Sequence, residues 1–402
     1  MASEPAGAMG AATNGVEIAL TARAVKQEPA GAVKRFYRPE LDWLRLVAFL
    51  AVYVHHAFPT TSLGYRIFGL PDGLAKPVWA MATAGGYGVD LFFTLSSFLI
   101  TELLLLEKEH TGRVHVKAFY FRRILRIWPL YFTFIFAAAL VERRYDVPLA
   151  YYAWLLLFAG NWHDVFFGAT GSFCAPLWSV SIEEQFYIVW PNLVGRISPG
   201  RFLRVMLGLF VFTCAYRAVY IAFHPNAEYD VWCQTFTRLD GFALGGLLAC
   251  ILHGRKTVLR RTQRIAALAL AAGLFWFLGT HPSAGNFGVF SLWTYPLAAL
   301  ASVMCILAFV TAPPRLSYGK PLQALSYLGK ISYGLYVFHM VGLFLARHFL
   351  LEGAVPNPRL WVWRALTGLL FTLVLAMGSY TVLEKPFLRM KRRFAYVQSR
   401  PE

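Results

Sequence analysis

An arginine and a histidine occupy the two ends of one apolar stretch, "RLVAFLAVYVHHAF", residues 45–58. In an α-helix each residue turns ~100° and rises ~1.5 Å, so Arg45 and His56 lie on one face about 16 Å apart. Asp42 lies on the same face, whereas His55 points well away from it. Imidazole acts as a general base or as a nucleophile, so this face could activate a hydroxyl group.

Two adjacent carboxylates, Glu183 and Glu184, lie in "WSVSIEEQFYIVWP". They are expected near the outer end of a predicted membrane span, as is His56 at the end of another. A carboxylate beside an imidazole can orient the ring and stabilise its charged form. Two polar groups in the lipid headgroup region would give the same pattern, and the residues alone favour neither interpretation.

Three arginines in "RRILRIWP", Arg122, Arg123 and Arg126, are expected at the inner mouth of a third span. Spacings of three and four residues place Arg123 and Arg122 each near Arg126 on the helix surface. Guanidinium groups pair with phosphate oxygens, so the cluster suits a phosphorylated ligand. Topological anchoring is the alternative, and for the cluster taken alone it is the favoured one.

Charged residues also lie inside predicted spans, where burial in lipid is costly and marks function. Arg217 is one, and "TRLDGFALGG" places Asp240 two residues after Arg238. Arg238 and Asp240 are therefore candidates for a substrate path through the membrane. An ion pair that only holds helices together would give the same pattern.

Composition identifies what surrounds these residues. Of 402 residues 57% are hydrophobic and 15% charged, with a mean hydropathy of +0.50. A soluble domain cannot bury that much apolar surface, so we expect an all-α polytopic membrane protein. A shorter apolar stretch at 149–162 is predicted to be a re-entrant or interfacial helix. Stretches of ~20 apolar residues predict ten transmembrane helices, at 41–60, 86–106, 124–141, 179–195, 202–223, 235–252, 265–280, 288–311, 327–349 and 361–383.

The basic residues indicate an orientation for these spans. With both termini in the cytoplasm and 149–162 not crossing, the inner segments hold 29 of the 38 lysines and arginines, as the positive-inside tendency requires. The same bias explains the net charge of +17 through contact with an anionic leaflet, without a nucleic-acid partner. We expect a bacterial inner or plasma membrane. The inner segments are 1–45, 107–126, 196–204, 253–264, 312–330 and 384–402.

The chain divides into three parts. The Ala/Gly-rich residues 1–33 predict a disordered cytoplasmic tail, 34–386 a membrane domain, and 387–402 a short basic cytoplasmic tail. The five cysteines show no metal-ligand spacing, so no metal site is predicted. Cys174 and Cys233 fall in predicted outer loops, where a disulfide is conceivable.

Several motifs, spread over residues 38–386, resemble the acyltransferase-3 family of integral-membrane acyltransferases. That family's first helix carries an arginine followed after ten residues by a histidine, which here selects Arg45 and His56. Its Arg-x-x-Arg corresponds to Arg123 and Arg126. In "LWSVSIEEQFY" the acidic position corresponds to Glu183.

Three further motifs extend the resemblance. In "GVDLFFTLSSFLIT" Ser96-Ser97 replaces the family's usual Ser-Gly, which puts close helix packing there in doubt. "SYTVLEKP" (379–386) is similar to a C-terminal motif of the family. "ISYGLYVFH" is similar to another and ends at His339, a further candidate for the substrate path. Any one motif is weak, but six in the right order are specific.

The resemblance implies that 34–386 is an acyltransferase domain. It would transfer an acetyl or other short acyl group from cytoplasmic acyl-CoA, a co-substrate and not a bound cofactor, to a hydroxyl of a carbohydrate or glycosylated acceptor. Arg122, Arg123 and Arg126 would hold the donor phosphates. His56, oriented by Glu183, would remove the hydroxyl proton or take the acyl group itself. The thioester arm would pass Arg45, which Asp42 accompanies on the same helix.

A transporter or flippase is the alternative function, because intramembrane Arg, Asp, Glu and His also line substrate or proton paths. The chain shows no repeat of two halves, which disfavours it. A purely structural scaffold would not need an aligned arginine and histidine within one span. Transfer from radiolabelled acetyl-CoA to a candidate glycan discriminates between the enzyme and the other two classes.

The charge distribution predicts a topology that labelling can test. Residues 107–126 and 253–264 should lie in the cytoplasm, and 142–178 and 224–234 outside. Single cysteines placed in each loop should react with a membrane-impermeant maleimide only in the second pair. Labelling of the 253–264 loop from outside intact cells would contradict the prediction.

Overall fold

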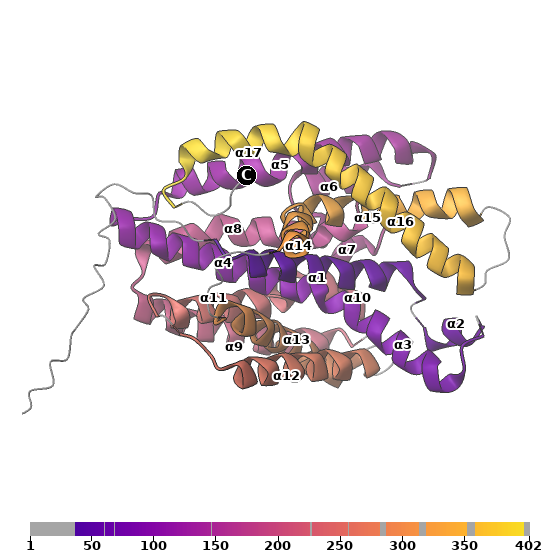
Figure 1. The fold of residues 1–402 in the computed structure, drawn as a ribbon, viewed down its shortest axis with the longest axis horizontal. Helices are drawn as coiled ribbons and strands as arrows, with labels where there is room; N and C mark the ends of the chain where they lie inside the picture. The colour runs from indigo at the N-terminus through magenta and orange to yellow at the C-terminus, as the bar shows by residue number, and fades with distance from the viewer. Residues whose placement is uncertain are drawn as a thin grey trace, which may run out of the picture. The chain divides into compact units, whose positions relative to one another are not determined.

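The computed structural model describes residues 37–397, except 60, 68, 146, 226, 256, 282–286, 313–318 and 352–357. Within this part of the chain every regular element is helical, and the longer helices run side by side (Figure 1). The predicted tail at 1–33 lies outside the described residues. The elements are α1 (Pro39–Ala57), α2 (Ser62–Ile67), α3 (Asp72–Ala84), η1 (Gly85–Tyr87), α4 (Gly88–Thr111), α5 (Val116–Val141), η2 (Glu142–Arg144), α6 (Leu149–Leu156), α7 (Gly160–Phe167), η3 (Ala175–Leu177), α8 (Trp178–Arg196), α9 (Pro199–Phe223), α10 (Glu228–Cys233), η4 (Thr235–Thr237), α11 (Asp240–Leu252), α12 (Arg261–Thr280), α13 (Phe287–Val310), α14 (Lys320–Lys330), α15 (Ser332–Leu351), α16 (Pro358–Ser379), η5 (Tyr380–Glu384), α17 (Lys385–Lys391) and η6 (Arg392–Phe394).

Six helical stretches of the described chain are long and apolar enough to cross a membrane, and a bent pair makes a seventh. The chain is therefore a multi-pass membrane protein, but the predicted count of ten spans is not confirmed. The six stretches are Gly73–Thr111, Val116–Arg144, Pro199–Phe223, Arg261–Thr280, Phe290–Val310 and Arg359–Lys391.

Three of the remaining predicted spans are helices that do not reach this length or apolarity. Helix α1 carries Glu40, Asp42 and Arg45, α8 carries two adjacent carboxylates, and α11 has only 13 residues. All three bury much of their surface against other helices. A helix shielded from lipid by its neighbours need not be apolar on every face, which accounts for the charged residues on these helices.

The predicted span at 327–349 is wrong at its start. The chain bends by 72° between α14 and α15, and Figure 1 views α14 end-on while its neighbours lie across the page. Helix α14 crosses α1 so closely that a Cβ at Gly329 would overlap the carbonyl of Asp42. The indole of Trp43 donates to the Ser326 hydroxyl at 2.8 Å and holds the same crossing together.

Short helices fill the region expected to lie outside. The stretch 149–162 forms parts of two eight-residue helices, α6 and α7, each about 12 Å long and too short to cross. They break at Phe158, a non-glycine residue with a φ of 52°. Cys174 and Cys233 are both buried free thiols, so the conceivable disulfide is not formed. The sequence analysis missed α3, which continues through η1 into α4.

Helix α4 is buried over most of its length and packs against several other helices of the described bundle. Helix α11 packs on it through Gly241 and Gly245, four residues apart. A Cβ at Gly245 would lie inside contact distance of the Thr94 carbonyl, so the close approach requires glycine. The Ser97 hydroxyl donates to the Phe242 carbonyl across this contact at 2.6 Å. Close packing is therefore kept where the family's serine–glycine pair is replaced.

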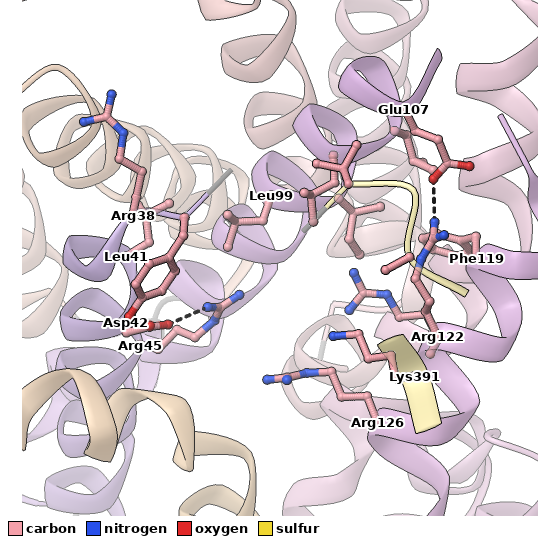
Figure 2. A pocket seen from close by; sticks show the side chains of 17 residues that line it. Arg38, Leu41, Asp42, Arg45, Leu99, Glu107, Phe119, Arg122, Arg126 and Lys391 are labelled. Carbon is pink, nitrogen blue, oxygen red and sulfur yellow. Dashed lines mark hydrogen bonds and ion pairs between the residues drawn. The ribbon is translucent and has the colours of Figure 1, made fainter. Parts of the chain in front are cut away.

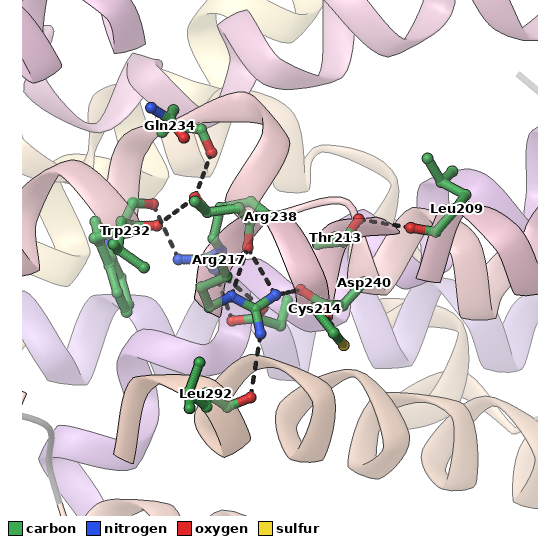
Figure 3. Close-up of polar contacts among 12 residues, drawn as sticks. Leu209, Thr213, Cys214, Arg217, Trp232, Gln234, Arg238, Asp240 and Leu292 are labelled. Carbon is green, nitrogen blue, oxygen red and sulfur yellow. Dashed lines mark hydrogen bonds and ion pairs between the residues drawn. The ribbon is translucent and has the colours of Figure 1, made fainter. Parts of the chain in front are cut away.

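Two buried ion pairs hold the helices around α4. Arg238 donates to both carboxylate oxygens of Asp90 on α4 at 3.0 Å. Arg217 on α9 pairs with Asp240 at the start of α11 and also donates to the carbonyls of Thr237 and Leu292 (Figure 3). The buried charges therefore form ion pairs that join helices, which is one of the two alternatives that the sequence left open. Arg238 pairs with Asp90 and not with Asp240, and Asp240 pairs with Arg217. Neither Arg238 nor Asp240 lines the cavities described below.

The Asp90–Arg238 pair yields a stability prediction. Asp90→Ala leaves a fully buried guanidinium without its carboxylate, which should cost about 3–5 kcal/mol of unfolding free energy. Asp90→Ala combined with Arg238→Met removes both charges and should recover much of that loss. Thermal unfolding in detergent measures both variants. A double variant no more stable than Asp90→Ala would show that this pair does not carry the packing.

Candidate functional site

An arginine-rich cavity of about 110 Å³ lies between α1, α4, α5 and α17. We call it the mouth. In Figure 2 Arg45 points into it from one side, and Arg126 and Lys391 point in from the opposite side. The excess of positive charge gives the mouth a potential that favours anions. Its charged lining residues are Arg38, Asp42, Arg45, Glu107, Arg122, Arg123, Arg126 and Lys391.

Two of the mouth's arginines are held by carboxylates. Arg45 pairs with Asp42 at 3.1 Å, one turn earlier on α1. Arg122 pairs with Glu107 at 2.7 Å and also donates to the Phe394 carbonyl at 2.7 Å. Arg122 is therefore already engaged, which separates it from the other arginines of the predicted phosphate cluster.

The other two arginines of that cluster have no carboxylate partner among the described residues. The Arg123 guanidinium lies over the rings of Phe119 and Tyr187, 5.4 and 5.0 Å from their centroids. Arg126, one turn further along α5, has neither an ion pair nor a hydrogen bond within the described part of the chain. Aromatic faces hold a guanidinium without neutralising it. Glu183 lies near both arginines, Glu184 near Arg123 and Glu384 near Arg126, but no ion pair with either arginine forms in the described chain.

A second cavity, the middle chamber of about 100 Å³, shares Arg45, Arg123 and Arg126 with the mouth. A chain of hydroxyl groups runs along its wall. Tyr187 donates to Glu183 at 3.1 Å, and Ser96 lies 2.5 Å from the Tyr187 hydroxyl.

The structure separates the two adjacent carboxylates. Glu183 lines the middle chamber, whereas Glu184 accepts a hydrogen bond from the indole of Trp128 at 3.2 Å in the contact between α5 and α8. The expectation that Glu183 orients His56 is not met, because Glu183 bonds Tyr187 one turn away and His56 lines a different cavity. Glu183 instead lines the middle chamber together with the three arginines that this chamber shares with the mouth.

A third cavity of about 600 Å³ contains both His55 and His56, and we call it the outer cavity. Helix α1 thus places Arg45 in the first two cavities and His56 in the third. Aromatic side chains make up half of the other lining residues. Flat aromatic faces stack against the C–H faces of sugar rings, while tyrosine and tryptophan tips offer hydrogen bonds. These rings belong to Trp79, Tyr87, Trp178, Tyr229, Trp232, Tyr295 and Tyr336.

The partner of His56 is His339 on α15. His339 Nδ1 lies 2.5 Å from the Tyr336 carbonyl, so this nitrogen carries the proton and Nε2 is an acceptor. His56 Nδ1 lies 3.0 Å from the Val52 carbonyl and 3.2 Å from His339 Nε2. A proton on His56 Nδ1 satisfies both contacts and leaves the lone pair of His56 Nε2 free. His56 is exposed, so this nitrogen is available to a substrate.

The neighbouring histidine is engaged elsewhere. His55 Nδ1 lies 3.1 Å from the carbonyl of Ala82 in the last turn of α3. Its ring also packs against Gly86 in η1. His55 therefore fastens α1 to the α3–α4 corner, although part of it lines the outer cavity.

The three cavities follow one another, because each shares wall residues with the next. The mouth and the middle chamber share three arginines, and the middle chamber and the outer cavity share Val89 and Tyr336.

Ser96 and Tyr187 in the middle chamber were not predicted as site residues from the sequence. Tyr187 could have been found, since it lies one turn after Glu183 on the same helical face. No group of three His, Cys, Asp or Glu in the described chain is placed to hold a metal ion.

Known proteins provide an independent comparison. The chain is 26% identical over 380 residues to the peptidoglycan O-acetyltransferase OatA of Listeria monocytogenes, covering 88% of this chain and 56% of that protein. It is 26% identical over 398 residues to the O-acetyltransferase OatA of Staphylococcus aureus, covering 90% of this chain and 59% of that one. The chain thus spans somewhat more than half the length of these relatives. No solved structure shows significant similarity to it.

The acyltransferase domain that defines the acyltransferase-3 family matches residues 38–381. This range covers the mouth's arginines, the middle chamber and both members of the histidine pair. The match extends over most of the 402 residues, so the chain belongs to the acyltransferase-3 family.

Proposed function

We propose that this protein is a membrane O-acyltransferase that moves an acetyl or other short acyl group from cytoplasmic acyl-CoA to a carbohydrate hydroxyl. The single observation that carries the proposal is the series of three cavities from the unpaired arginines to His56. The names of the two relatives, both O-acetyltransferases, support the same reaction class. A glycan of the cell envelope is the acceptor class that we infer.

The donor binds with its phosphates at the mouth. Arg123 and Arg126 are not held in an ion pair by the carboxylates near them, so phosphate oxygens can pair with them directly. Arg45 lies on the wall shared with the middle chamber, where the pantetheine arm enters. Its contact with Asp42 holds the guanidinium along this wall.

The acceptor binds in the outer cavity, where its sugar ring stacks on the aromatic wall and one hydroxyl approaches His56 Nε2. In direct transfer the hydroxyl oxygen bonds the acyl carbon, the carbon–sulfur bond breaks, and the proton passes through His56 to the CoA thiolate. In the two-step alternative His56 Nε2 bonds the acyl carbon while the carbon–sulfur bond breaks and the CoA thiolate leaves. The hydroxyl oxygen then bonds the acyl carbon, the carbon–nitrogen bond breaks, and the hydroxyl proton passes through the released imidazole to the thiolate. Both routes use the same residues and give the same products.

His339 acts in either route as a positioning residue. Its bond to the Tyr336 carbonyl sets its own tautomer, and the contact between His339 Nε2 and His56 Nδ1 sets the tautomer of His56. A histidine with the wrong tautomer would present an N–H to the acceptor hydroxyl and could not remove its proton. We infer that the inner segments, including both termini, face the cytoplasm of a bacterial inner or plasma membrane.

The proposal predicts a donor-binding defect. Arg123→Ala and Arg126→Ala should each weaken acetyl-CoA binding about 10- to 100-fold, since a charge-assisted hydrogen bond contributes about 1.5–3 kcal/mol. Lysine should rescue only partly, because an ammonium lacks the planar fork. Binding of radiolabelled acetyl-CoA to purified protein measures this, with exposed Arg201→Ala as the control. Unchanged affinity in a folded Arg123→Ala/Arg126→Ala variant would make these arginines topological anchors.

The histidine pair predicts an order of activity losses. His56→Ala should reduce acyl transfer by at least about 10²-fold, the usual loss for a general base. His339→Ala and Glu183→Gln should impair transfer less, and His55→Ala should keep most activity. Transfer from radiolabelled acetyl-CoA to a glycan fragment is measured at matched expression. If His56→Ala were active and His55→Ala inactive, the assignment of His56 as the reacting histidine would be wrong.

A further inference from the structure

A single tyrosine ring stands between the middle chamber and the outer cavity. Tyr336 lines both cavities, and Val89 is the other residue that the two walls share. The side chain is largely buried between them. A thioester that enters from the mouth therefore meets Tyr336 before it can reach His56.

Two hydrogen bonds to the η3–α8 segment hold the ring in this position. The Tyr336 hydroxyl lies 2.8 Å from the Ser179 hydroxyl and donates to the Pro176 carbonyl at 3.0 Å. The Ser179 hydroxyl also lies 3.1 Å from this carbonyl, and its single proton bonds either that oxygen or the Tyr336 hydroxyl. The edge of the Phe92 ring also contacts the Tyr336 ring, with centroids 5.8 Å apart.

The backbone of Tyr336 has a separate task, because its carbonyl accepts the Nδ1 proton of His339. A rotation of the tyrosine side chain leaves this carbonyl in place. The ring also packs against the His339 imidazole, with centroids 5.5 Å apart, so its departure gives up this contact but keeps the hydrogen bond that sets the His339 tautomer. The backbone of Tyr336 thus supports the histidine pair even when the side chain moves.

Water in the outer cavity makes such a barrier necessary. Beside a general base, a water oxygen can bond the acyl carbon of the donor, the carbon–sulfur bond breaks, and the water proton passes to the CoA thiolate. The products are acetate and free CoA, and no acceptor is modified. A partition that closes the middle chamber suppresses this loss.

We propose that Tyr336 is a gate that keeps the donor thioester away from outer-cavity water and that moves aside for transfer. The inference rests on the proposed function and extends it with a positioning residue that couples donor cleavage to acceptor acylation. Tyr336→Ala should raise CoA release without an acceptor about 10-fold or more. Tyr336→Phe keeps the ring but removes both contacts of its hydroxyl, and Ser179→Ala removes only the contact with Ser179. Both variants should raise CoA release by a smaller factor, Ser179→Ala by the least.

The experiment uses the purified full chain in detergent with acetyl-CoA and no acceptor, and measures free CoA thiol and acetate over time. Phe338→Ala is the matched control, because this ring lies on the same helix and packs against Phe134, outside the three cavities. Adding His56→Ala to Tyr336→Ala should abolish the increase. General destabilisation would lower CoA release, so an increase reports the gate.

The outcomes separate this inference from the proposed function. If the unmodified protein fails to bind radiolabelled acetyl-CoA, the proposed function is wrong and the gate falls with it. If it binds acetyl-CoA but Tyr336→Phe and Ser179→Ala release CoA at the unmodified rate, the gate alone is overturned. Tyr336→Phe and Ser179→Ala therefore test the gate even when Tyr336→Ala does not fold.

Discussion

A charge buried among membrane helices needs a partner, since the effective cost of desolvating one ion is several kcal/mol. Asp90 on α4 and Asp240 on α11 supply that partner for Arg238 and Arg217, and α9, α11 and α13 are thereby joined to α4. The Arg238 guanidinium also lies 4.2 Å from the Tyr295 ring centroid. The ion pairs therefore hold the helices together, and the paired Arg238 also contacts Tyr295 in the aromatic wall of the outer cavity.

The same requirement identifies the charges that are kept for a ligand. Arg122 and Arg45 have carboxylate partners, whereas Arg123 and Arg126 have none in the described part of the chain. Glu183 lies in the same chamber as both arginines without forming an ion pair with either, so an anion that enters the chamber can still pair with them. An arginine pair that looks like a topological anchor in the sequence is therefore a candidate donor site, because the described structure shows no ion pair that occupies it.

Backbone carbonyls rather than carboxylates organise the histidine pair. The Val52 and Tyr336 carbonyls fix the protons of His56 and His339, and no acidic residue of the described chain bonds either ring. A neutral partner leaves the electron pair of His56 Nε2 available without placing a further charge in the bundle. The dyad combines α1 with α15, which are 283 positions apart at these two residues.

The apolar composition and the spacing of Arg45 and His56 were sufficient to predict a helical membrane protein with one polar face on α1. Local periodicity decides which face of a helix is polar, so this part needed no tertiary information. The sequence could not pair Arg238 with Asp90 or His56 with His339, because such contacts depend on how distant helices pack. It likewise could not separate Glu183 from Glu184, or find the bend between α14 and α15. Sequence alone predicts the chemistry carried by each helix, and packing decides which groups meet, since a side chain's partners are set by neighbours that are remote in the chain.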